Sequence, residues 1–563
     1  MLEKITLKSS SSATRPATAF NPGAVTVLVG PNNSGKTLFL QEVEPMLSQP
    51  TQTGTRIIGQ VVAKKVPDKA VADLIAARGQ VNLEREQRTN REAEVEVATV
   101  NRLRPQGGGA IGGEQFSFRK VDGAWSLGGA DETNRLAVLF TLLLDGRTRL
   151  ALLDQKQTSS TYAPPPDHLA VLFREHVVRR ELARLTHDAF GEYLTIDATS
   201  MQYLSVQLSR SKPPDDPELE ISPTHPVSRA FHKGARPIGQ FSDGVKAYIG
   251  ILAAVIATEF RLILIDEPEA FLHPMLSQRL GRHLGEIAKQ RDGGIIAATH
   301  DADFLMGAVQ SGAPVTVVRL TYSADTATSR VLEHVQLKEL MMDPLLRSTG
   351  VLRALFHAGA VVCEADADRA FYQECNERLL TFDRPTAAAD TLFLGLNGKD
   401  VIHRVVAPLR AMGIPAAALV DVDILKKDAL IRLLKAACVP PGELPQFEQQ
   451  LDNAQQEFVA AGVDPDADGL KKIAGKLPPA ALALLAEAAK YGVFVVPVGE
   501  VENWLPGLGV TVRKKRWMPA IFAAMKDDPA VPGYVKPGAD DVWQFLRSIA
   551  AWIGNPARLG IPP

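Results

Sequence analysis

Cysteine is scarce in this sequence of 563 residues, which contains only three. Cys363, Cys375 and Cys438 lie in apolar stretches, and their spacing matches neither a disulfide framework nor a CxxC metal motif. We therefore expect buried thiols in a reducing compartment. Long hydrophobic runs are also missing, because the longest, residues 247–260, falls short of the ~20 residues that span a bilayer. Nothing after Met1 resembles a signal peptide, so we expect a cytoplasmic protein without membrane contact.

The charges are nearly balanced, since 62 Lys and Arg residues against 64 Asp and Glu residues give a net charge of -2. The sequence therefore lacks the global positive field of many nucleic-acid binders, and any such contact has to come from a local basic surface. Apolar residues make up 45% and charged residues 22%, which is typical of globular protein and excludes general disorder. The length predicts several domains.

The segment GPNNSGKT, residues 30–37, fits the phosphate-loop pattern GxxxxGK[ST]. A β-branched run at 25–29 precedes it and helical apolar spacing follows it, so backbone N–H groups can wrap phosphates at a helix N-terminus. Lys36 is expected to reach the β and γ oxygens, and the Thr37 hydroxyl to ligate Mg²⁺. The residues expected to bind ATP here are Gly30, Asn32, Asn33, Ser34, Gly35, Lys36 and Thr37.

Two carboxylates end the apolar strand predicted at 262–265. Asp266 is expected to hold the Mg²⁺ shell, and Glu267 to orient and deprotonate the attacking water. His300 ends the next predicted strand, 295–298, and is placed to polarise the γ-phosphate. Alone, an acidic pair after a strand is usually a helix cap and a lone histidine an ordinary surface residue. The catalytic interpretation therefore depends on the phosphate loop in the same chain.

The segment FSDGVK, residues 241–246, precedes an apolar helix and would alone be an ordinary N-cap. Together with the phosphate loop, IDEPEAFLHP at 265–274 and ATH at 298–300, it resembles the ABC ATPase superfamily, specifically its RecF/SMC/OLD-like branch. The resemblance implies that Ser242 and Gly244 contact the γ-phosphate bound by the opposite protomer. Two copies would then form a head-to-head homodimer with ATP between them. For the family's glutamine loop, Gln155 is a candidate.

The region from about 50 to 237 is less regular, and we interpret it as a large insertion that carries dimer or partner contacts. Its pattern predicts helices over 68–91, 133–144 and 166–194, and a proline-rich loop over 212–226. The glycine run 107–113 is either a second phosphate loop or a hairpin tip, and the lack of a following Lys-Ser/Thr favours the tip. A linker at 337–350 separates the predicted domains, 1–345 and 346–563.

A second α/β pattern follows the linker, with strands predicted at 360–363, 392–394, 416–420 and 494–496 and helices at 369–380 and 401–412. Glu364 ends the first of these strands, and Asp368 begins the next helix. Asp421 and Asp423 follow the strand predicted at 416–420. The carboxyl ends of parallel strands line one crevice, so these carboxylates are expected to converge. Such like charges repel unless cations lie among them, and hard oxygen ligands favour Mg²⁺ or Mn²⁺.

This acidic pattern resembles a Toprim domain, the metal-dependent fold of topoisomerases, primases and OLD-family nucleases. Glu364 matches the strand-end glutamate of that fold, and Asp421 and Asp423 match its DxD motif. Asp368 matches the second acid of the first motif in the OLD branch, although Ala365 stands where glycine is common. The resemblance implies catalytic and metal-binding roles for these carboxylates. Two bound ions would activate a water and stabilise the leaving oxygen of a phosphodiester.

Two further elements lie near the end of the sequence. Glu502 is expected to supply the later acidic element of those nucleases, with Glu500 as the reserve. The basic run RKKRW, residues 513–517, is either a solvated face or a grip on the phosphate backbone. In the second case Lys514 or Lys515, of which we favour Lys515, would stabilise the transition state.

The expected fold class is α/β: an ABC-type phosphate-loop ATPase head with a large inserted region, followed by a Toprim-like α/β domain. The resemblance implies an OLD-like, ATP-regulated nuclease that cuts DNA or RNA and belongs to bacterial defence against phage. Its cofactors would be ATP and Mg²⁺ or Mn²⁺, and its partners nucleic acid, a second copy and an accessory protein. The alternative is an ATP-hydrolysing sensor or scaffold that binds nucleic acid or a partner without cutting. A transporter subunit is disfavoured, because it would leave the acidic domain without a purpose.

Overall fold

The computed structural model describes residues 1–563 except 13–14, 50–53, 89–90, 102–114, 129–131, 147–148, 161, 324, 336, 339–349, 397, 399–400, 426, 463–476, 514–515 and 563. We call residues 1–338 the N-terminal unit and residues 350–562 the C-terminal unit, each of which contains a largely parallel sheet. No helix within the described residues is both long enough and apolar enough to cross a bilayer.

A six-stranded sheet forms the centre of the N-terminal unit, with the strand order β17-β16-β3-β15-β14-β9. Its strands are β3 (Val25–Val29), β9 (Thr141–Leu144), β14 (Leu262–Asp266), β15 (Gly294–Ala298), β16 (Val315–Ser323) and β17 (Thr326–Leu332). All neighbours are parallel except β16 and β17. The strands predicted at 25–29, 262–265 and 295–298 are confirmed. A parallel sheet covered on both faces needs continuous apolar runs, which these strands supply.

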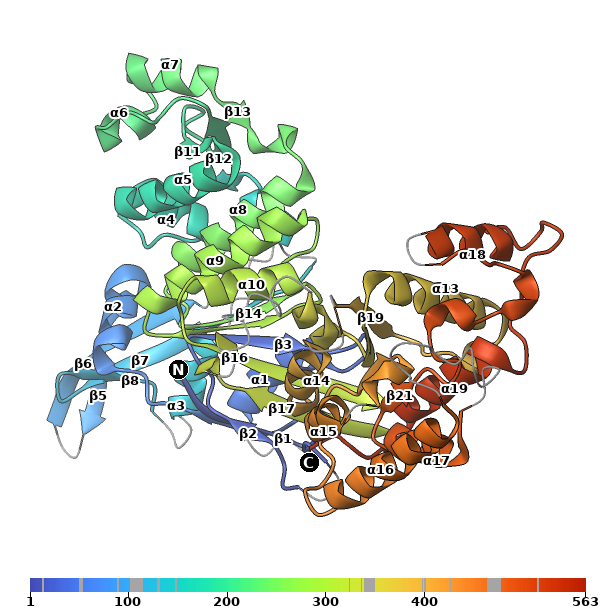
Figure 1. Cartoon of the computed structure of the whole chain (residues 1–563). Helices are drawn as coiled ribbons and strands as arrows, with labels where there is room; N and C mark the ends of the chain where they lie inside the picture. Colours follow the sequence, from blue (N-terminus) through green and yellow to red (C-terminus); the bar gives the residue numbers. More distant parts are fainter. Residues whose placement is uncertain are drawn as a thin grey trace.

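Helices cover both faces of this sheet (Figure 1). One face packs on α8 (Asp243–Ile256), α9 (Pro274–Gln290) and α10 (Ala302–Gln310), and the other on α1 (Lys36–Ser48). Alternate residues of β14 serve the two layers, so that Ile263 and Ile265 point to the first face and Leu262 and Leu264 to the second. The sheet therefore presents its strand ends, where the sequence motifs lie, between two helical layers.

The segment 50–237 returns to the central sheet before it forms a separate lobe. Its first part builds β4 (Ile58–Ala63), which pairs with β1 (Leu2–Leu7), and then α2 (Asp68–Arg78) and a sheet of β5 (Gln80–Arg88), β6 (Arg91–Asn101), β7 (Gln115–Val121) and β8 (Ala124–Ser126). After α3 (Glu132–Leu139), β9 pairs with β14 at the edge of the central sheet. Part of this segment thus completes the core of the N-terminal unit.

Two helix predictions in this segment are wrong in their second halves. The prediction over 68–91 holds only for α2, because β5 follows it and pairs with β6. The prediction over 133–144 holds only for α3, because the short apolar run 141–144 is used as the edge strand β9. Apolar runs of this length suit either a buried helix or a strand, and pairing with β14 decides between them. The glycine run 107–113 lies outside the described residues.

The lobe follows, with α4 (His168–Arg174), α5 (His176–Phe190), β11 (Tyr193–Asp197) and β12 (Tyr203–Ser209) as its main elements. Helices α4 and α5 confirm the prediction over 166–194 as far as Phe190, where Gly191 ends α5 with a φ of 70°, and its last two residues belong to β11 instead. The proline-rich loop 212–226 contains one short helix, α6 (Pro217–Ile221). Figure 1 shows the lobe above α8 and α9, on the side of the central sheet away from α1.

The C-terminal unit is built on four parallel strands in the order β19-β18-β20-β21. They are β18 (Gly359–Cys363), β19 (Thr391–Gly395), β20 (Ala416–Val420) and β21 (Val493–Val495), and the flanking helices include α13 (Asp366–Phe382) and α14 (Ile402–Ala411). The second α/β pattern read from the sequence is confirmed. Cys363 and Cys375 are buried thiols, as expected, and Cys438 is half-buried.

Candidate ATP site and acidic crevice

The loop between β3 and α1 needs glycine at its first position. Gly30 has a φ of 140°, and a Cβ atom there would lie 2.0 Å from the backbone oxygen of Leu320. Gly35, with a φ of 95°, precedes α1, and Asn33 also has a positive φ of 60°. These conformations turn the chain sharply from the strand into the helix. The loop has the backbone form that the phosphate-loop pattern predicts.

Lys36 is 5% exposed and points back into this loop. Its Nζ atom donates hydrogen bonds to the carbonyls of Gly30 and Pro31, both at 2.8 Å, and lies 3.4 Å from the Ser34 hydroxyl. Burial lowers the pKa of Lys36 to about 8, and neighbouring carboxylates, Glu269 foremost, oppose that shift. The ammonium thus lies inside the loop that would surround a phosphate group.

Thr37 and Asp266 are brought together from opposite ends of the N-terminal unit. The Thr37 hydroxyl donates to Oδ1 of Asp266 at 3.1 Å, because β3 and β14 flank β15 and end at the same edge of the sheet. Burial raises the pKa of Asp266, whereas the hydrogen bond from Thr37 opposes the rise. A hydroxyl and a carboxylate in contact supply hard oxygen atoms of the kind that Mg²⁺ prefers.

Glu267 is exposed and has an unusual backbone conformation, with a φ of 48°. Its N–H donates to the carbonyl of Ala298 at 2.8 Å. The guanidinium of Arg149, which is 1% exposed, donates to the carbonyls of both Glu267 and Asp266. Arg149 begins the short helix η1 (Arg149–Leu153), and nothing in the local sequence marks it as part of the site. No sequence pattern therefore identifies Arg149, although it holds the backbone of the acidic pair.

Glu269 was also missed, although it connects the acidic strand to the histidine. Its carboxylate accepts hydrogen bonds from the Thr299 hydroxyl and the His300 N–H, both at 2.7 Å. Partial burial lowers the pKa of His300, Lys36 lowers it further, and Glu267 opposes both. The His300 ring therefore shares one electrostatic environment with the phosphate-loop lysine and the candidate general base. Lys36, Glu267 and His300 come together at one edge of the sheet.

The signature-like segment lies at the N-terminus of α8. Ser242 is the exposed N-cap residue, and Gly244 packs so closely that a Cβ atom would lie 2.5 Å from the carbonyl oxygen of Phe271. Phe271 is 58% exposed in the loop between β14 and α9. This exposed surface joins the signature-like segment to the loop that carries the acidic pair. Gln155 is exposed in the loop after η1.

Part of the N-terminal unit matches a known protein family. Residues 196–307, which include the signature-like segment, the acidic strand and His300, match the family described as "AAA domain, putative AbiEii toxin, Type IV TA system". The chain contains an AAA-type ATPase domain. Such a domain implies ATP as the nucleotide of the phosphate loop. The match covers well under half of the chain, and no curated protein matches it.

Solved structures of SMC head domains are distantly similar to this ATPase. An SMC head bound to the C-winged helix domain of ScpA has a TM-score of 0.33 and 13% identity, and covers 60% of this chain and 99% of its own. The head from Thermotoga maritima has a TM-score of 0.28 and 15% identity, with coverages of 59% and 99%. The head with an extended coiled coil, bound to the C-terminal domain of ScpA from Pyrococcus furiosus, has a TM-score of 0.32 and 12% identity, with coverages of 60% and 98%. Likeness at this level carries no functional argument.

The acidic residues of the C-terminal unit converge as expected from their strand ends. Oε1 of Glu364, which follows β18, accepts a hydrogen bond from the N–H of Asp421, which follows β20, at 3.0 Å. Oδ2 of Asp368, in the first turn of α13, accepts from the N–H of Ala365 at 3.0 Å. Because β18 and β20 are parallel neighbours, Glu364 and Asp421 follow the same edge of the sheet, where a parallel sheet is expected to form a crevice. We call residues 364, 368, 421, 423, 500 and 502 the acidic crevice.

The carboxyl groups of the acidic crevice raise one another's pKa. Burial raises the pKa of Asp421 to about 9, and Glu364, Asp368, Asp423 and Glu500 add to the rise. Burial likewise raises the pKa of Asp368 to about 6. All of these effects favour the protonated acids, so the ionised cluster requires positive charge nearby.

A basic side chain from the run 513–517 reaches the acidic crevice. Nη1 of Arg513 lies 3.6 Å from Oε2 of Glu500 and 3.9 Å from Oε2 of Glu502. Lys514 and Lys515 lie outside the described residues. Within the described part of the chain, no three His, Cys, Asp or Glu side chains are grouped so as to hold a metal ion. The donors of the acidic crevice are carboxylate oxygens, which suit Mg²⁺ or Mn²⁺ in kind.

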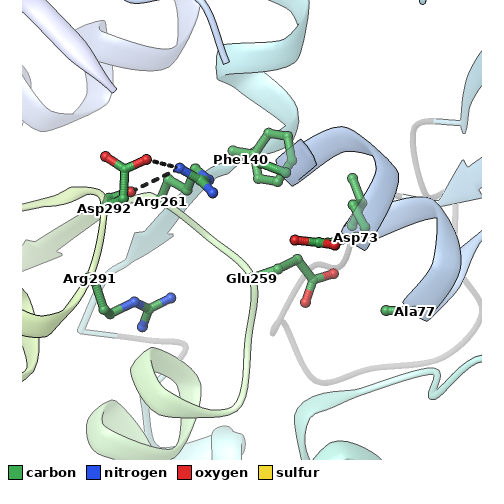
Figure 2. Close-up of a pocket in the computed structure, with 9 residues that line it drawn as sticks. Asp73, Ala77, Phe140, Glu259, Arg261, Arg291 and Asp292 are labelled. Carbon is green, nitrogen blue, oxygen red and sulfur yellow. Dashed lines mark hydrogen bonds and ion pairs between the residues drawn. The ribbon is translucent and has the colours of Figure 1, made fainter. Parts of the chain in front are cut away.

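A cavity of about 350 Å³ lies away from both sites, between α2 and the segments that flank β14 (Figure 2). Arg261 forms an ion pair with Asp292 there, and Arg78 of α2 forms one with Glu259. Arg291 donates to the carbonyl of Phe260 at 2.7 Å. Because the ion pair of Arg78 with Glu259 holds α2 against the segment before β14, we assign this cavity to the attachment of α2.

Proposed function

We propose that this protein is an ATP-regulated, divalent-metal-dependent nuclease that cleaves the phosphodiester bonds of nucleic acid. The observation that carries the proposal is that oxygen-bearing side chains come together at strand ends in two separate places. One cluster joins Thr37 and Asp266 beside the phosphate loop, and the other joins Glu364 and Asp421 in the acidic crevice. On this proposal residues 1–345 form the ATPase domain and residues 346–563 the nuclease domain.

In the ATP site, Lys36 would exchange its carbonyl acceptors for phosphate oxygens, while Thr37 and Asp266 would hold Mg²⁺. Glu267 is exposed at the end of β14, which lets it orient a water against the γ-phosphate. His300 would donate to the same phosphate group. The exposed N-terminus of α8, with Ser242 and Gly244, would complete the site of a second copy, since a helix N-terminus favours anions. A homodimer through these faces follows from this assignment.

In the acidic crevice, Mg²⁺ or Mn²⁺ would offset the carboxylate charge and activate water. The Glu364 carboxylate already accepts a hydrogen bond from the backbone N–H of Asp421. The carboxylates of Asp421, Asp423, Asp368 and Glu502 would supply further oxygen ligands. Basic side chains of the run 513–517, including Lys515, would contact the phosphate backbone and stabilise the transition state. Binding of a nucleic-acid substrate would therefore depend on this local basic surface and not on the net charge of the chain.

The test uses the full chain with a panel of single- and double-stranded DNA and RNA, with and without ATP, and with Mg²⁺ or Mn²⁺. Glu364→Gln is expected to lower cleavage about 100-fold or more and to leave ATP hydrolysis unchanged. Glu377→Gln is the matched control, because Glu377 is an exposed glutamate of α13. It should keep both activities. Absence of cleavage by the unmodified protein under all conditions would refute the nuclease assignment.

The second candidate is an ATP-hydrolysing sensor or scaffold that binds nucleic acid or a partner without cutting. The ion pairs of Arg513 with Glu500 and Glu502 favour it, because they already neutralise part of the acidic charge. In that case Glu364→Gln leaves nucleic-acid binding unchanged and there is no cleavage to lose. A role in defence against phage belongs to the proposal as a consequence of the OLD-like resemblance, and an accessory protein and a cytoplasmic location are proposed with it.

A further inference from the structure

A buried hydrogen bond joins the helix that carries Asp368 to the loop that carries Glu502. Nε1 of Trp504 donates to the Tyr372 hydroxyl at 2.9 Å, although the two residues are 132 positions apart in the chain. Tyr372 is 1% exposed and Trp504 is 3% exposed, so the bond lies in a region of low dielectric. A contact of this kind fixes two distant segments of the C-terminal unit relative to each other.

Tyr372 determines where the start of α13 lies. Asp368 and Tyr372 both belong to this helix, and a spacing of four residues places their side chains on one face, one turn apart. The Asp368 carboxylate also accepts from the N–H of Ala365 at 3.0 Å. Because backbone hydrogen bonds connect successive turns of a helix, a shift of Tyr372 would move Asp368 with it.

Trp504 determines the place of Glu502 in a similar way. Glu502 lies in the short helix η8 (Val501–Asn503), which ends directly before Trp504. The start of the same loop is bonded to the turn after β20, where the N–H of Val422 donates to the carbonyl of Gly499 at 3.1 Å. The loop is therefore held at one end by the turn that follows β20 and at the other end, through the indole, by α13.

Aromatic packing keeps the two partners of this bond in place. The centroid of the Phe545 ring lies 5.4 Å from that of Trp504 and 6.3 Å from that of Tyr372. Phe545 belongs to α19 (Asp541–Gly554), a helix that packs against α13. Both rings thus share one aromatic neighbour, which limits how far either of them can turn.

We infer that Tyr372 and Trp504 are positioning residues, which set the separation of the Asp368 and Glu502 carboxylates and thereby the affinity of the acidic crevice for a divalent cation. Ionised carboxylates repel each other, and the hydrogen bond between the two segments resists their separation. Groups behind metal ligands commonly orient them in this way. The inference rests on the proposed metal-binding role of the acidic crevice and names what orients two of its ligands.

Two conservative variants test the hydrogen bond. Tyr372→Phe removes the acceptor, and Trp504→Phe removes the donor, while each keeps an aromatic ring. The readout is the Mn²⁺ affinity of the full chain without nucleotide, measured by electron paramagnetic resonance of free Mn²⁺, with Glu364→Gln to identify the ion in the acidic crevice. We expect each variant to bind this ion about 10-fold more weakly. The Mn²⁺ concentration for half-maximal cleavage should rise by the same factor, with little change of rate at saturating Mn²⁺.

The double variant separates the hydrogen bond from the two rings. Because one bond can be lost only once, Tyr372→Phe combined with Trp504→Phe should also weaken Mn²⁺ binding by about 10-fold.

Two matched controls lie where the strands of the same sheet begin. The Tyr491 hydroxyl donates to Oε2 of Glu443 at 2.5 Å, and Nε1 of Trp552 donates to the carbonyl of Lys490 at 3.0 Å. Lys490 and Tyr491 precede β21, at the edge opposite to the acidic crevice. Tyr491→Phe and Trp552→Phe should therefore leave the Mn²⁺ affinity unchanged.

Three results would overturn the inference. They are a normal Mn²⁺ affinity in both single variants, even with a lower Tm, a loss of about 100-fold in the double variant, or an equal loss in the two controls. If Glu364→Gln does not reduce Mn²⁺ binding, the proposed metal site is itself wrong and the inference falls with it. If Mn²⁺ binds there but no nucleic acid is cut, only the nuclease proposal fails, and the affinities still decide the role of Tyr372 and Trp504.

Discussion

Replacing Arg149 by methionine should lower both the folding stability and the rate of ATP hydrolysis, although Arg149 belongs to no sequence motif. The guanidinium is buried and donates to the carbonyls of Asp266 and Glu267. The Glu267 carbonyl also accepts from the N–H of Ala270 at 3.0 Å, so the Asp266 carbonyl is the acceptor that loses its donor in the methionine variant. An acceptor left without its donor costs about 1–3 kcal/mol of folding stability. Glu267, held at a φ of 48°, would also relax. A displacement of about 1 Å costs roughly 100-fold in rate, so kcat should fall by that order with a smaller change in the KM for ATP.

The assays are denaturant unfolding and steady-state ATP hydrolysis. Arg149→Lys should be intermediate, because an ammonium lacks the planar fork that reaches both carbonyls. Arg174→Met is the matched control, since Arg174 also donates to backbone carbonyls, at Ala163 and Ser160, but lies in the lobe. It should leave kcat unchanged. The reasoning is refuted if Arg149→Met hydrolyses ATP at the normal rate, or if Arg174→Met loses as much activity.

Four other outcomes are expected. Glu267→Gln should bind ATP but hydrolyse it at least about 100-fold more slowly, as measured by nucleotide binding and phosphate release. Gly30→Ala should abolish ATP binding in a filter or fluorescence assay, because its Cβ would lie 2.0 Å from a backbone oxygen. Arg179→Met should cost about 3–5 kcal/mol in denaturant unfolding, because it leaves the buried carboxylate of Glu220, paired at 2.9 Å, without its cation. Burial lowers the pKa of His283 below its usual 6.5, so the unfolded chain binds a proton that the folded chain resists. The stability that comes from keeping His283 neutral is complete above about pH 6.5 and decreases at lower pH. The fall in Tm between pH 7 and pH 5 should therefore be smaller in His283→Gln than in the unmodified protein.

Much of the ATP site could be predicted because its motifs are local. The run 25–37 contains strand, loop and helix in order, and Asp266 ends its own apolar strand, so each piece is specified by its neighbours in sequence. The convergence of Glu364 and Asp421 was predictable for a related reason. Parallel strands place their carboxyl ends at one edge whatever their order, and here β18 and β20 are direct neighbours.

The parts that could not be predicted depend on contacts between distant segments. The run 141–144 becomes a strand only because β14, far along the chain, offers it an edge. Arg149 matters because η1 packs beneath the end of the same strand, and Glu269 because Thr299 and His300 come to it from β15. Local sequence patterns indicate which helices and strands can form, and pairing with distant segments decides which of them do form.

The hydrogen bond from Thr37 to Asp266 joins residues that are 229 positions apart. A nucleotide that binds both Thr37 and Asp266 connects two distant parts of the chain. Its binding free energy then adds to the free energy needed to separate them. At 100 times the Kd, such a ligand protects the folded state by about 2.7 kcal/mol. Depletion of nucleotide would therefore expose this protein to proteases, so its lifetime would follow the energy supply of its surroundings.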